Sequence, residues 1–309
     1  MNTSPNIQRV LQALNANRTP GWQFPAHYLG LAFEQLTEKR AEVSMYAGPH
    51  CIGAQRRVSL EALGVLADVA MAGAVRGRMG NAARVATVSI RLSLGVLPAD
   101  GKLRAAAELK LNPANSAVRM ATTALTVEAN GSLCCIGEAS FAAIDSRRVV
   151  ASHPLSKCSA LECTQPLAPE ELTPEELFVL NSARLADAES REDHAFIERF
   201  WGCSATHGDG WAALRVAGGL HTANRVGDIQ GGLLLGLGGR ICLAALSQDW
   251  RLVDLSAQYI TASPGKGVVM QAKTLRVGRS LASVGCEAVD DAGNITFRAQ
   301  ASLVRNIHS

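Results

Sequence analysis

The sequence lacks the features of a membrane, secreted or nucleic-acid-binding protein. No apolar run approaches the roughly 18–20 residues that cross a bilayer, and the first 18 residues, MNTSPNIQRVLQALNANR, contain no apolar signal-peptide core. The formal net charge of +3 is too small to indicate a nucleic-acid partner. We therefore expect a cytoplasmic protein that binds neither membranes nor nucleic acid.

Motifs for metals, nucleotides and serine nucleophiles are also missing. The eight cysteines are scattered, with Cys134 and Cys135 adjacent, and they form no pair of C-x-x-C units of the kind that binds zinc. A P-loop, a G-x-S-x-G elbow and a complete G-x-G-x-x-G are absent. Reduced thiols and no cofactor or metal are expected.

The 309 residues are 48% apolar and 18% charged, which is enough for a sizeable core and unlike a disordered chain. An internal repeat divides them. A histidine, His50 or His221, lies nine residues before Ser59 in the first half and before Gln230 in the second. A Pro-free apolar run of helix length follows in each half. The shared histidine position favours a structural role for both side chains.

About four strand-like segments follow each apolar run. Residues 86–94, ATVSIRLSL, alternate, with Val88 on the apolar face and Thr87 on the polar face, and residues 253–261 are their counterpart. Turns are expected near Pro98, Pro264, Gly131 and Gly293. The predicted fold class is α+β, with a long helix and about four antiparallel strands in each half.

The segment 146–202 interrupts the repeat and is rich in Pro, Glu and Ser. Thr173, Pro174 and Glu176 have the spacing of an N-cap, a first helical residue and a capping-box partner. A second helix start is expected at Ser4. Both helices are expected to pack only against the sheets.

One stretch, HTANRVGDIQGGLLLGLGG, combines glycines with the start of an apolar helix. Glycines there let the backbone turn tightly, and the first N–H groups of the helix have no intrahelical acceptor. Such N–H groups, at the positive end of the helix dipole, suit a carbonyl oxygen that becomes an oxyanion. The polar and glycine positions follow N-x-x-G-x-x-Q-G-G: Asn224, Gly227, Gln230, Gly231 and Gly232.

This pattern resembles the PaaI-like thioesterases of the hotdog fold, whose motif reads N-x-x-G-x-x-H-G-G, with Gln230 in place of His. The phrase GVLADVA resembles the L-A-D of that family, in which the acid, here Asp68, is catalytic and faces the loop of a partner hotdog. The resemblance implies a tandem hotdog chain, in which each hotdog is an antiparallel sheet wrapped around a long central helix. The two hotdogs are residues 20–145 and 203–309, joined by a helical linker 146–202.

The residues themselves also single out Asp68. A carboxylate among Leu66, Val69 and other apolar residues costs several kcal/mol to bury as an ion without partners, so it needs a reason to be there. That reason is either catalysis or a hydrogen bond to a neighbouring backbone group or water. The first half keeps this acid but has Ser59 in the loop; the second keeps the loop but has Gly239 in place of the acid. We expect a single composite site.

The resemblance implies hydrolysis of an acyl-CoA, with CoA as part of the substrate. The Gly231 N–H, with Asn224 or Gln230 nearby, is expected to stabilise the oxyanion, while Asp68 either activates water or attacks directly. Three further residues are expected to contact substrate: Gly232, Arg276 and Arg279. A solvated strand end is an equal alternative for the two arginines.

Two other functions stay open. The chain could be a non-catalytic acyl-CoA-binding or partner protein, since half of the ancestral sites are degenerate. A hotdog enoyl-CoA hydratase fits less well, because no Asp is followed by His at the usual spacing. A homodimer or a larger homo-oligomer is expected.

Overall fold

One antiparallel sheet of twelve strands forms the body of the molecule, in the order β1-β2-β4-β5-β6-β3-β9-β12-β11-β10-β8-β7. Read outward from the β3–β9 junction, the first half gives β3-β6-β5-β4-β2-β1 and the second gives β9-β12-β11-β10-β8-β7. The two halves thus repeat one strand order, as the internal repeat predicts. The computed structural model describes residues 4–19, 23–80, 83–111, 119–144, 160–190, 195–202, 205–262 and 266–306.

The β3–β9 junction joins the halves by five residue pairs, from Ser89 opposite Gln258 to Ser93 opposite Asp254. The two strands run antiparallel, so the junction strands of the two halves point in opposite directions. The strands are β1 (Ala32–Leu36), β2 (Arg40–Ala47), β3 (Arg84–Leu94), β4 (Gly101–Leu111), β5 (Met120–Ala129), β6 (Ser132–Ile144), β7 (Thr206–Gly208), β8 (Trp211–Ala217), β9 (Trp250–Tyr259), β10 (Gly267–Val277), β11 (Leu281–Val289) and β12 (Ile295–Arg305).

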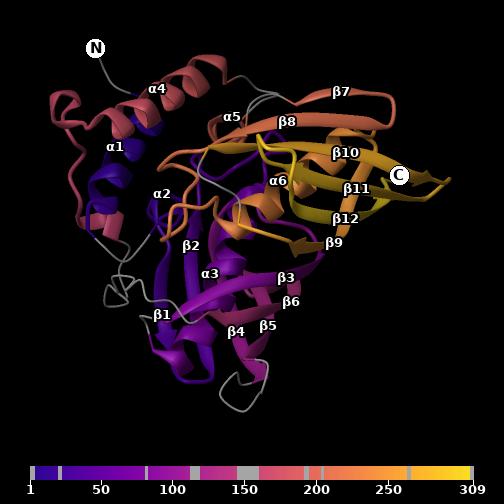
Figure 1. Cartoon of the computed structure of the whole chain (residues 1–309), viewed down its shortest axis with the longest axis horizontal. Coiled ribbons are helices and arrows are strands. Elements are labelled where there is room, and N and C mark those ends of the chain that lie inside the picture. Colours follow the sequence, from indigo (N-terminus) through magenta and orange to yellow (C-terminus); the bar gives the residue numbers. More distant parts are fainter. Residues whose placement is uncertain are drawn as a thin grey trace.

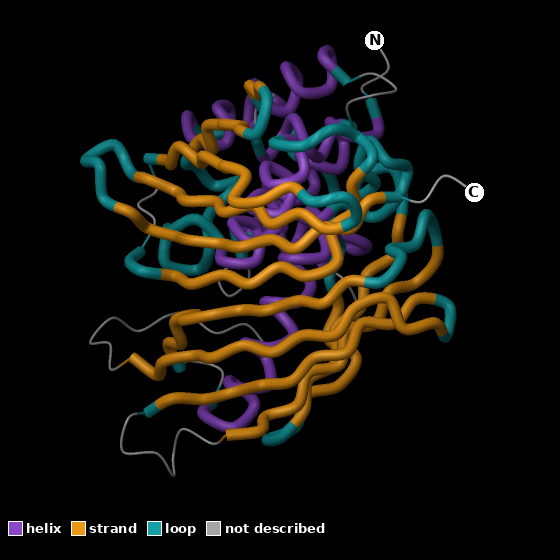
Figure 2. The backbone as a smooth tube through the Cα atoms, turned by 90° about the vertical axis from the view of Figure 1, so that its right-hand side faces the viewer, coloured by secondary structure: helices purple, strands orange, loops and turns teal. Residues whose placement is uncertain are grey.

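Two apolar helices, α3 (Leu60–Met79) and α6 (Gly231–Ala244), lie side by side against one face of the sheet (Figures 1 and 2). Their backbones touch, because a side chain at Gly64 would collide with the carbonyl of Gly232, and one at Gly232 with the carbonyl of Gly64. Glycine at both positions therefore permits the closest approach of the helices. Among the described helices, none is long and apolar enough to span a membrane.

The capping predictions are confirmed. The Ser4 hydroxyl caps α1 (Pro5–Asn17), and Thr173 and Glu176 form a capping box on α4 (Pro174–Glu189). The expectation that these helices pack only against the sheets is wrong: α1 packs on α4 and on α2 (Phe24–Leu29), and α4 packs on α5 (Phe196–Trp201). Figure 1 shows α1 and α4 together at the periphery. Two short 3₁₀ segments complete the linker: η2 (Ala160–Cys163) and η3 (Pro169–Glu171).

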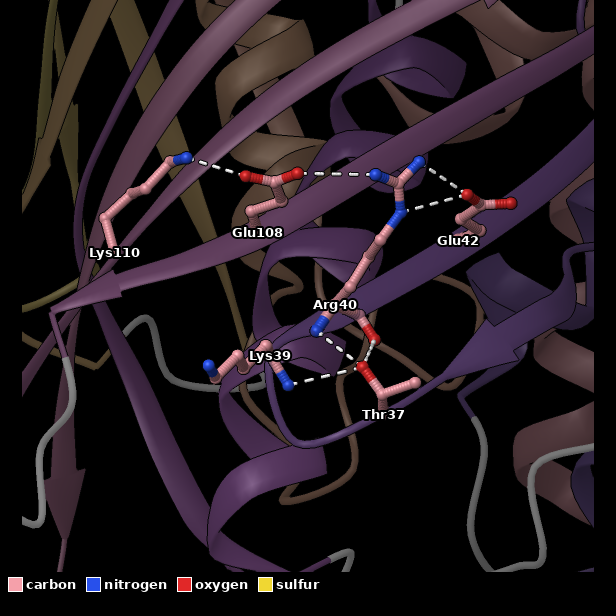
Figure 3. Close-up of polar contacts among 6 residues, drawn as sticks. All are labelled: Thr37, Lys39, Arg40, Glu42, Glu108 and Lys110. Carbon is pink, nitrogen blue, oxygen red and sulfur yellow. Dashed lines mark hydrogen bonds and ion pairs between the residues drawn. The ribbon is translucent and has the colours of Figure 1, made fainter.

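Figure 3 shows a charged network on the outer surface of β2 and β4. Arg40 forms ion pairs with Glu42 at 2.6 Å and with Glu108 at 3.3 Å, and Lys110 joins Glu108 at 2.6 Å. The Thr37 hydroxyl accepts a hydrogen bond from the Arg40 N–H in the turn between β1 and β2. Such exposed ion pairs add little to the stability of the fold, so we assign this network no functional role.

Three glycines at the turns expected from the sequence have the backbone conformation that such turns favour. Gly101, Gly131 and Gly293 have positive φ, which glycine adopts without strain. The expected turn at Pro264 lies outside the described residues. Six cysteines are described and all are free thiols, of which only Cys163 is exposed.

Candidate active site

The start of α6 meets the middle of α3, and this contact brings together the acid of one half and the loop of the other. The Gln230 side-chain Nε2 donates a hydrogen bond of 2.7 Å to Oδ2 of Asp68. Asp68 and Gln230 are only 8% and 1% exposed. The Thr87 hydroxyl, from β3, donates to Oδ1 of the same carboxylate at 3.0 Å.

The Asp68 carboxylate is buried but well supplied with donors. Burial raises its pKa, and the Thr87 hydroxyl, the Arg76 charge and the Gly232 N–H each oppose that rise. Hydrogen bonds to the ionised form favour it, whereas burial disfavours it. Asp68 thus has a reason to lie in the core: it accepts hydrogen bonds from both halves of the chain.

Gln230 has a fixed orientation, because both ends of its amide are used. Its Oε1 caps α6 by accepting a hydrogen bond of 2.6 Å from the Leu233 N–H, so Nε2 must point to Asp68. The second N–H of the amide can still be donated to another group. Gln230 therefore holds the acid and caps the helix at the same time.

Gly231 is the first residue of α6, so its N–H has no acceptor within the helix. Tyr259, at the end of β9, donates a hydrogen bond of 2.6 Å to the Gly231 carbonyl. A side chain at position 231 would lie 3.3 Å from the Tyr259 ring and 3.5 Å from the Thr87 hydroxyl. Because glycine stands there, the helix start lies directly beside the groups around Asp68. A carbonyl bound there could be polarised next to a carboxylate.

Sequence reasoning missed both Thr87 and Tyr259. Strict alternation placed Thr87 on the outer face with Ser89, but the pairing of β3 with β6 shifts register between these two residues. This bulge turns Thr87 towards Asp68 and leaves Val88 37% exposed. Bulges re-aim side chains in this way, and the alternating pattern carried no signal for one.

Asn224 and Gly232 have other contacts than those expected. The Asn224 side-chain oxygen accepts hydrogen bonds from the N–H groups of Val226 and Asp228, at 2.9 and 3.1 Å, and so shapes its own loop. Gly227 has φ +92° in the same loop. The Gly232 N–H favours the ionised Asp68 carboxylate and so lowers its pKa. Both residues therefore support the groups that face the candidate site.

The corresponding place in the first half is different. Ser59 caps α3 by accepting a hydrogen bond of 3.1 Å from the Ala62 N–H, as Gln230 caps α6, but it has no acid to hold. The position matching Asp68 is Gly239, and a side chain there would meet three leucines: Leu60, Leu252 and Leu255. Apolar side chains fill the space where a second acid would have to stand.

Charged residues lie close to this filled site. Glu61, only 1% exposed, forms an ion pair of 2.6 Å with Arg240 across the helix contact. Glu198 of α5 accepts a hydrogen bond of 2.9 Å from the Ala54 N–H in the first-half loop. Burial and the nearby Glu61 charge raise the pKa of Glu198. No pattern in the sequence predicted these contacts. The Glu198 side chain, from the linker, closes the first-half loop.

The two histidines of the repeat accept hydrogen bonds through their main-chain carbonyls, and the structural role of their side chains stays a prediction. The His50 carbonyl accepts a hydrogen bond from the Tyr28 hydroxyl, and the His221 carbonyl accepts one from the Trp201 indole. Burial lowers the pKa of His50 to about 3 and that of His221 to about 4, so both rings are neutral near pH 7.

The structure does not bring Arg276 and Arg279 to the Asp68 cluster. Both are exposed, at or near the turn between β10 and β11. In that turn the Ser280 carbonyl accepts a hydrogen bond from the Arg305 N–H. Arg305 lies opposite Trp250, the first residue of β9, whereas Tyr259 is the last. The turn with the two arginines is therefore at the opposite end of β9 from Tyr259.

A groove of about 1250 Å³ lies on the sheet away from this cluster. Residues from both halves line it, including Arg91, Glu138, Trp211 and Lys273. None of its lining residues belongs to the Asp68 cluster, so the groove does not mark the candidate site. Within the described part of the chain, no group of three or more His, Cys, Asp or Glu could hold a metal ion.

Comparison with solved structures identifies the fold. A conserved protein of unknown function with a hot dog fold from Alicyclobacillus acidocaldarius matches 92% of this chain and 98% of its own, at TM-score 0.56 and 8% identity. A tesB protein from Mycobacterium avium subsp. paratuberculosis matches 89% and 96%, at TM-score 0.53 and 10% identity.

A 12:0-ACP thioesterase from Umbellularia californica matches 85% of this chain and 93% of its own, at TM-score 0.53 and 8% identity. No family model and no curated protein sequence matches the chain. The chain therefore has the α+β hotdog fold, while the low identities carry no conclusion about its substrate.

Proposed function

We propose that this chain is a tandem hotdog acyl-CoA thioesterase with a single composite site between its two halves. Asp68 and the start of α6, Gln230 to Gly232, form that site. The observation that carries the proposal is the 2.7 Å hydrogen bond from Gln230 to Asp68. It joins the acid of one half to the loop of the other, and the mirror position has Gly239 in place of an acid.

The reaction needs a nucleophile and an oxyanion site on either side of one carbonyl carbon. The Gly231 N–H would stabilise the negative charge on the thioester oxygen as the tetrahedral intermediate forms. Asp68 would either take a proton from a water that attacks the carbon or attack it directly to give a mixed anhydride. In both routes the C–S bond breaks, the CoA thiolate leaves and takes up a proton, and water supplies the oxygen of the acid.

Thr87 and Tyr259 would act as positioning residues. Thr87 fixes one carboxylate oxygen of Asp68 while Gln230 fixes the other. Tyr259 holds the Gly231 carbonyl and thereby the direction of its peptide plane at the helix start. This scheme requires neither a metal nor the His that the motif of the PaaI-like thioesterases contains.

Release of free thiol from a panel of acyl-CoA thioesters, followed with a thiol reagent, tests the proposal. We expect turnover by the wild-type chain and a loss on the order of 10²-fold or more for Asp68→Asn. Binding of acyl-CoA without any thiol release would instead indicate a non-catalytic acyl-CoA-binding protein. A single turnover in ¹⁸O-water that places ¹⁸O in Asp68 would establish direct attack, with water opening the mixed anhydride at the Asp68 carboxyl carbon, because the general-base route never forms a bond to Asp68.

A further inference from the structure

The linker helix α5 contacts both the loop before α3, the first-half loop, and the loop before α6, the second-half loop. Its Glu198 accepts the hydrogen bond of 2.9 Å from the Ala54 N–H of the first-half loop. Its Trp201 donates a buried hydrogen bond of 3.0 Å from the indole Nε1 to the His221 carbonyl, where the second-half loop begins. Side chains three residues apart are neighbours on a helix. One short helix therefore holds both loops.

Aromatic rings connect the same two loops through α2 and α5. The centre of the His50 ring lies 6.2 Å from that of Tyr28, and the Tyr28 ring lies 5.6 Å from that of Phe200. The Phe200 ring in turn lies 5.3 Å from that of His221. Tyr28 and Phe200 are buried, and a close-packed interior transmits displacements because it has few voids. A shift of α5 would therefore be passed on to the second-half loop.

The second-half loop leads from Trp201 to the candidate site. The Thr222 carbonyl, next to His221, accepts a hydrogen bond of 2.9 Å from the Gln230 N–H. Gln230 in turn donates the hydrogen bond of 2.7 Å that holds Asp68. Hydrogen bonds and one peptide link thus connect the indole of α5 with the carboxylate of the candidate site.

The first-half loop has no acid to hold, and it binds the linker instead. Gly53 stands at the position that matches Asn224, whose side-chain oxygen accepts hydrogen bonds from its own loop. Glycine has no such acceptor. The Glu198 carboxylate oxygen lies 2.5 Å from the place that a Cβ on Gly53 would take, and it binds the neighbouring Ala54 N–H. Glu198 therefore supplies, from a distant part of the chain, the acceptor that Gly53 lacks.

We propose that the degenerate first-half loop anchors α5, and that α5 positions the second-half loop for catalysis. Glu198 and Trp201 are then positioning residues: neither belongs to the Asp68 cluster, and both act on it through His221 and Gln230. This inference rests on the proposed function, because it assigns the two residues a part in the same reaction. It also gives the half that lacks a working site a role at the site of the other half.

Glu198→Ala tests the anchor, and Glu198→Gln is its conservative partner. Ala removes the acceptor of the Ala54 N–H, whereas the amide oxygen of Gln can keep it. We expect kcat for thiol release to fall by roughly 10-fold or more in Glu198→Ala at nearly constant KM, because a misplaced group slows the chemical step more than it weakens binding. Glu198→Gln should restore turnover close to that of the wild type.

Ser59→Ala is the matched control. It removes the helix cap of 3.1 Å in the same first-half loop but leaves the contacts of α5 in place, so turnover should not change. If Glu198→Ala does not fold, Trp201→Phe takes its place, because it keeps a buried ring but has no N–H to donate to the His221 carbonyl. The same loss of kcat is then expected.

Amide hydrogen exchange gives a readout that needs no turnover. The Gln230 N–H, bonded to the Thr222 carbonyl, reports on the second-half loop. Its exchange should be about 10-fold faster in Glu198→Ala than in the wild type, and unchanged in Glu198→Gln and Ser59→Ala. This result would support the anchor even if no thioester is hydrolysed and the proposed function fails.

Two results would overturn the inference. Equal exchange at Gln230 in the wild type and in Glu198→Ala would show that the anchor does not reach the second-half loop, even in an active enzyme. Equal losses of turnover in Glu198→Ala and Ser59→Ala would show that turnover follows the general stability of the first half instead of the position of α5.

Discussion

Replacing Asp68 by Asn removes the charge but almost none of the shape. The amide oxygen of Asn can accept the hydrogen bonds of Gln230 and Gly232, and the Thr87 hydroxyl can rotate to accept from the amide nitrogen. Turnover should fall on the order of 10²- to 10⁴-fold, the range for loss of a positioned base. The free energy of unfolding should change by less than about 1 kcal/mol, because a weaker hydrogen bond is offset by loss of a buried charge.

Asp68→Ala is the matched comparison. It leaves the Gln230 Nε2 buried without its acceptor, which costs about 1–3 kcal/mol. Thiol release measures turnover, and denaturant unfolding measures stability. Turnover by Asp68→Asn close to that of the wild type would refute the role of the acid. If Asp68→Asn and Asp68→Ala lowered the free energy of unfolding equally, the hydrogen bond from Gln230 Nε2 to Asp68 would be refuted.

The pH dependence of stability gives an independent check on Asp68. Burial raises its pKa above the value in the unfolded chain, so the folded state binds the proton more tightly. The contribution of this group to stability is therefore complete below the unfolded pKa of about 3.9 and is lost as pH rises through the folded pKa. Asp68→Asn, which does not titrate, should lose less stability over that interval when both proteins are unfolded in urea.

Three further outcomes are expected. Thr87→Val removes a hydrogen bond that lowers the pKa of Asp68, so the acidic limb of the turnover–pH profile should move to higher pH; an unmoved limb would exclude this contact. Gln230→Ala and Ser59→Ala each remove a helix cap and should cost about 1 kcal/mol, yet only Gln230→Ala should lower turnover, by about 10²-fold. Gly232→Ala should destabilise the chain by about 1–3 kcal/mol in thermal unfolding, since its methyl group meets the α3 backbone; unchanged stability would contradict the close packing.

Local patterns in the sequence predicted much of the fold. The repeat predicted equal strand orders on either side of the junction, and the apolar run from Leu60 predicted α3 because it contains no Pro and is buried on most sides. The capping box at Thr173 was also visible, since capping depends on residues three apart. The proposed domain boundaries stay a prediction.

The pairing of Asp68 with the loop of Gln230 was accessible for a different reason. The resembling family builds each site from the acid of one hotdog and the loop of the other, and the two halves of this chain have lost complementary residues. Contacts that depend on three-dimensional packing were not accessible. A bulge in β3 directs Thr87 inward, and the position of the linker helix α5 brings Glu198 to the first-half loop. Neither follows from alternation or composition, because each depends on how distant segments pack.

The count of binding sites tests the central claim, that only one of the two related places in the chain is a working site. Asp68→Asn should bind an acyl-CoA substrate and hydrolyse it far more slowly than the wild type, so calorimetry can measure the number of equivalents bound before the substrate is consumed. We predict one equivalent per chain, because Leu60, Leu252 and Leu255 fill the space at Gly239. Two equivalents of similar affinity per chain would contradict the account.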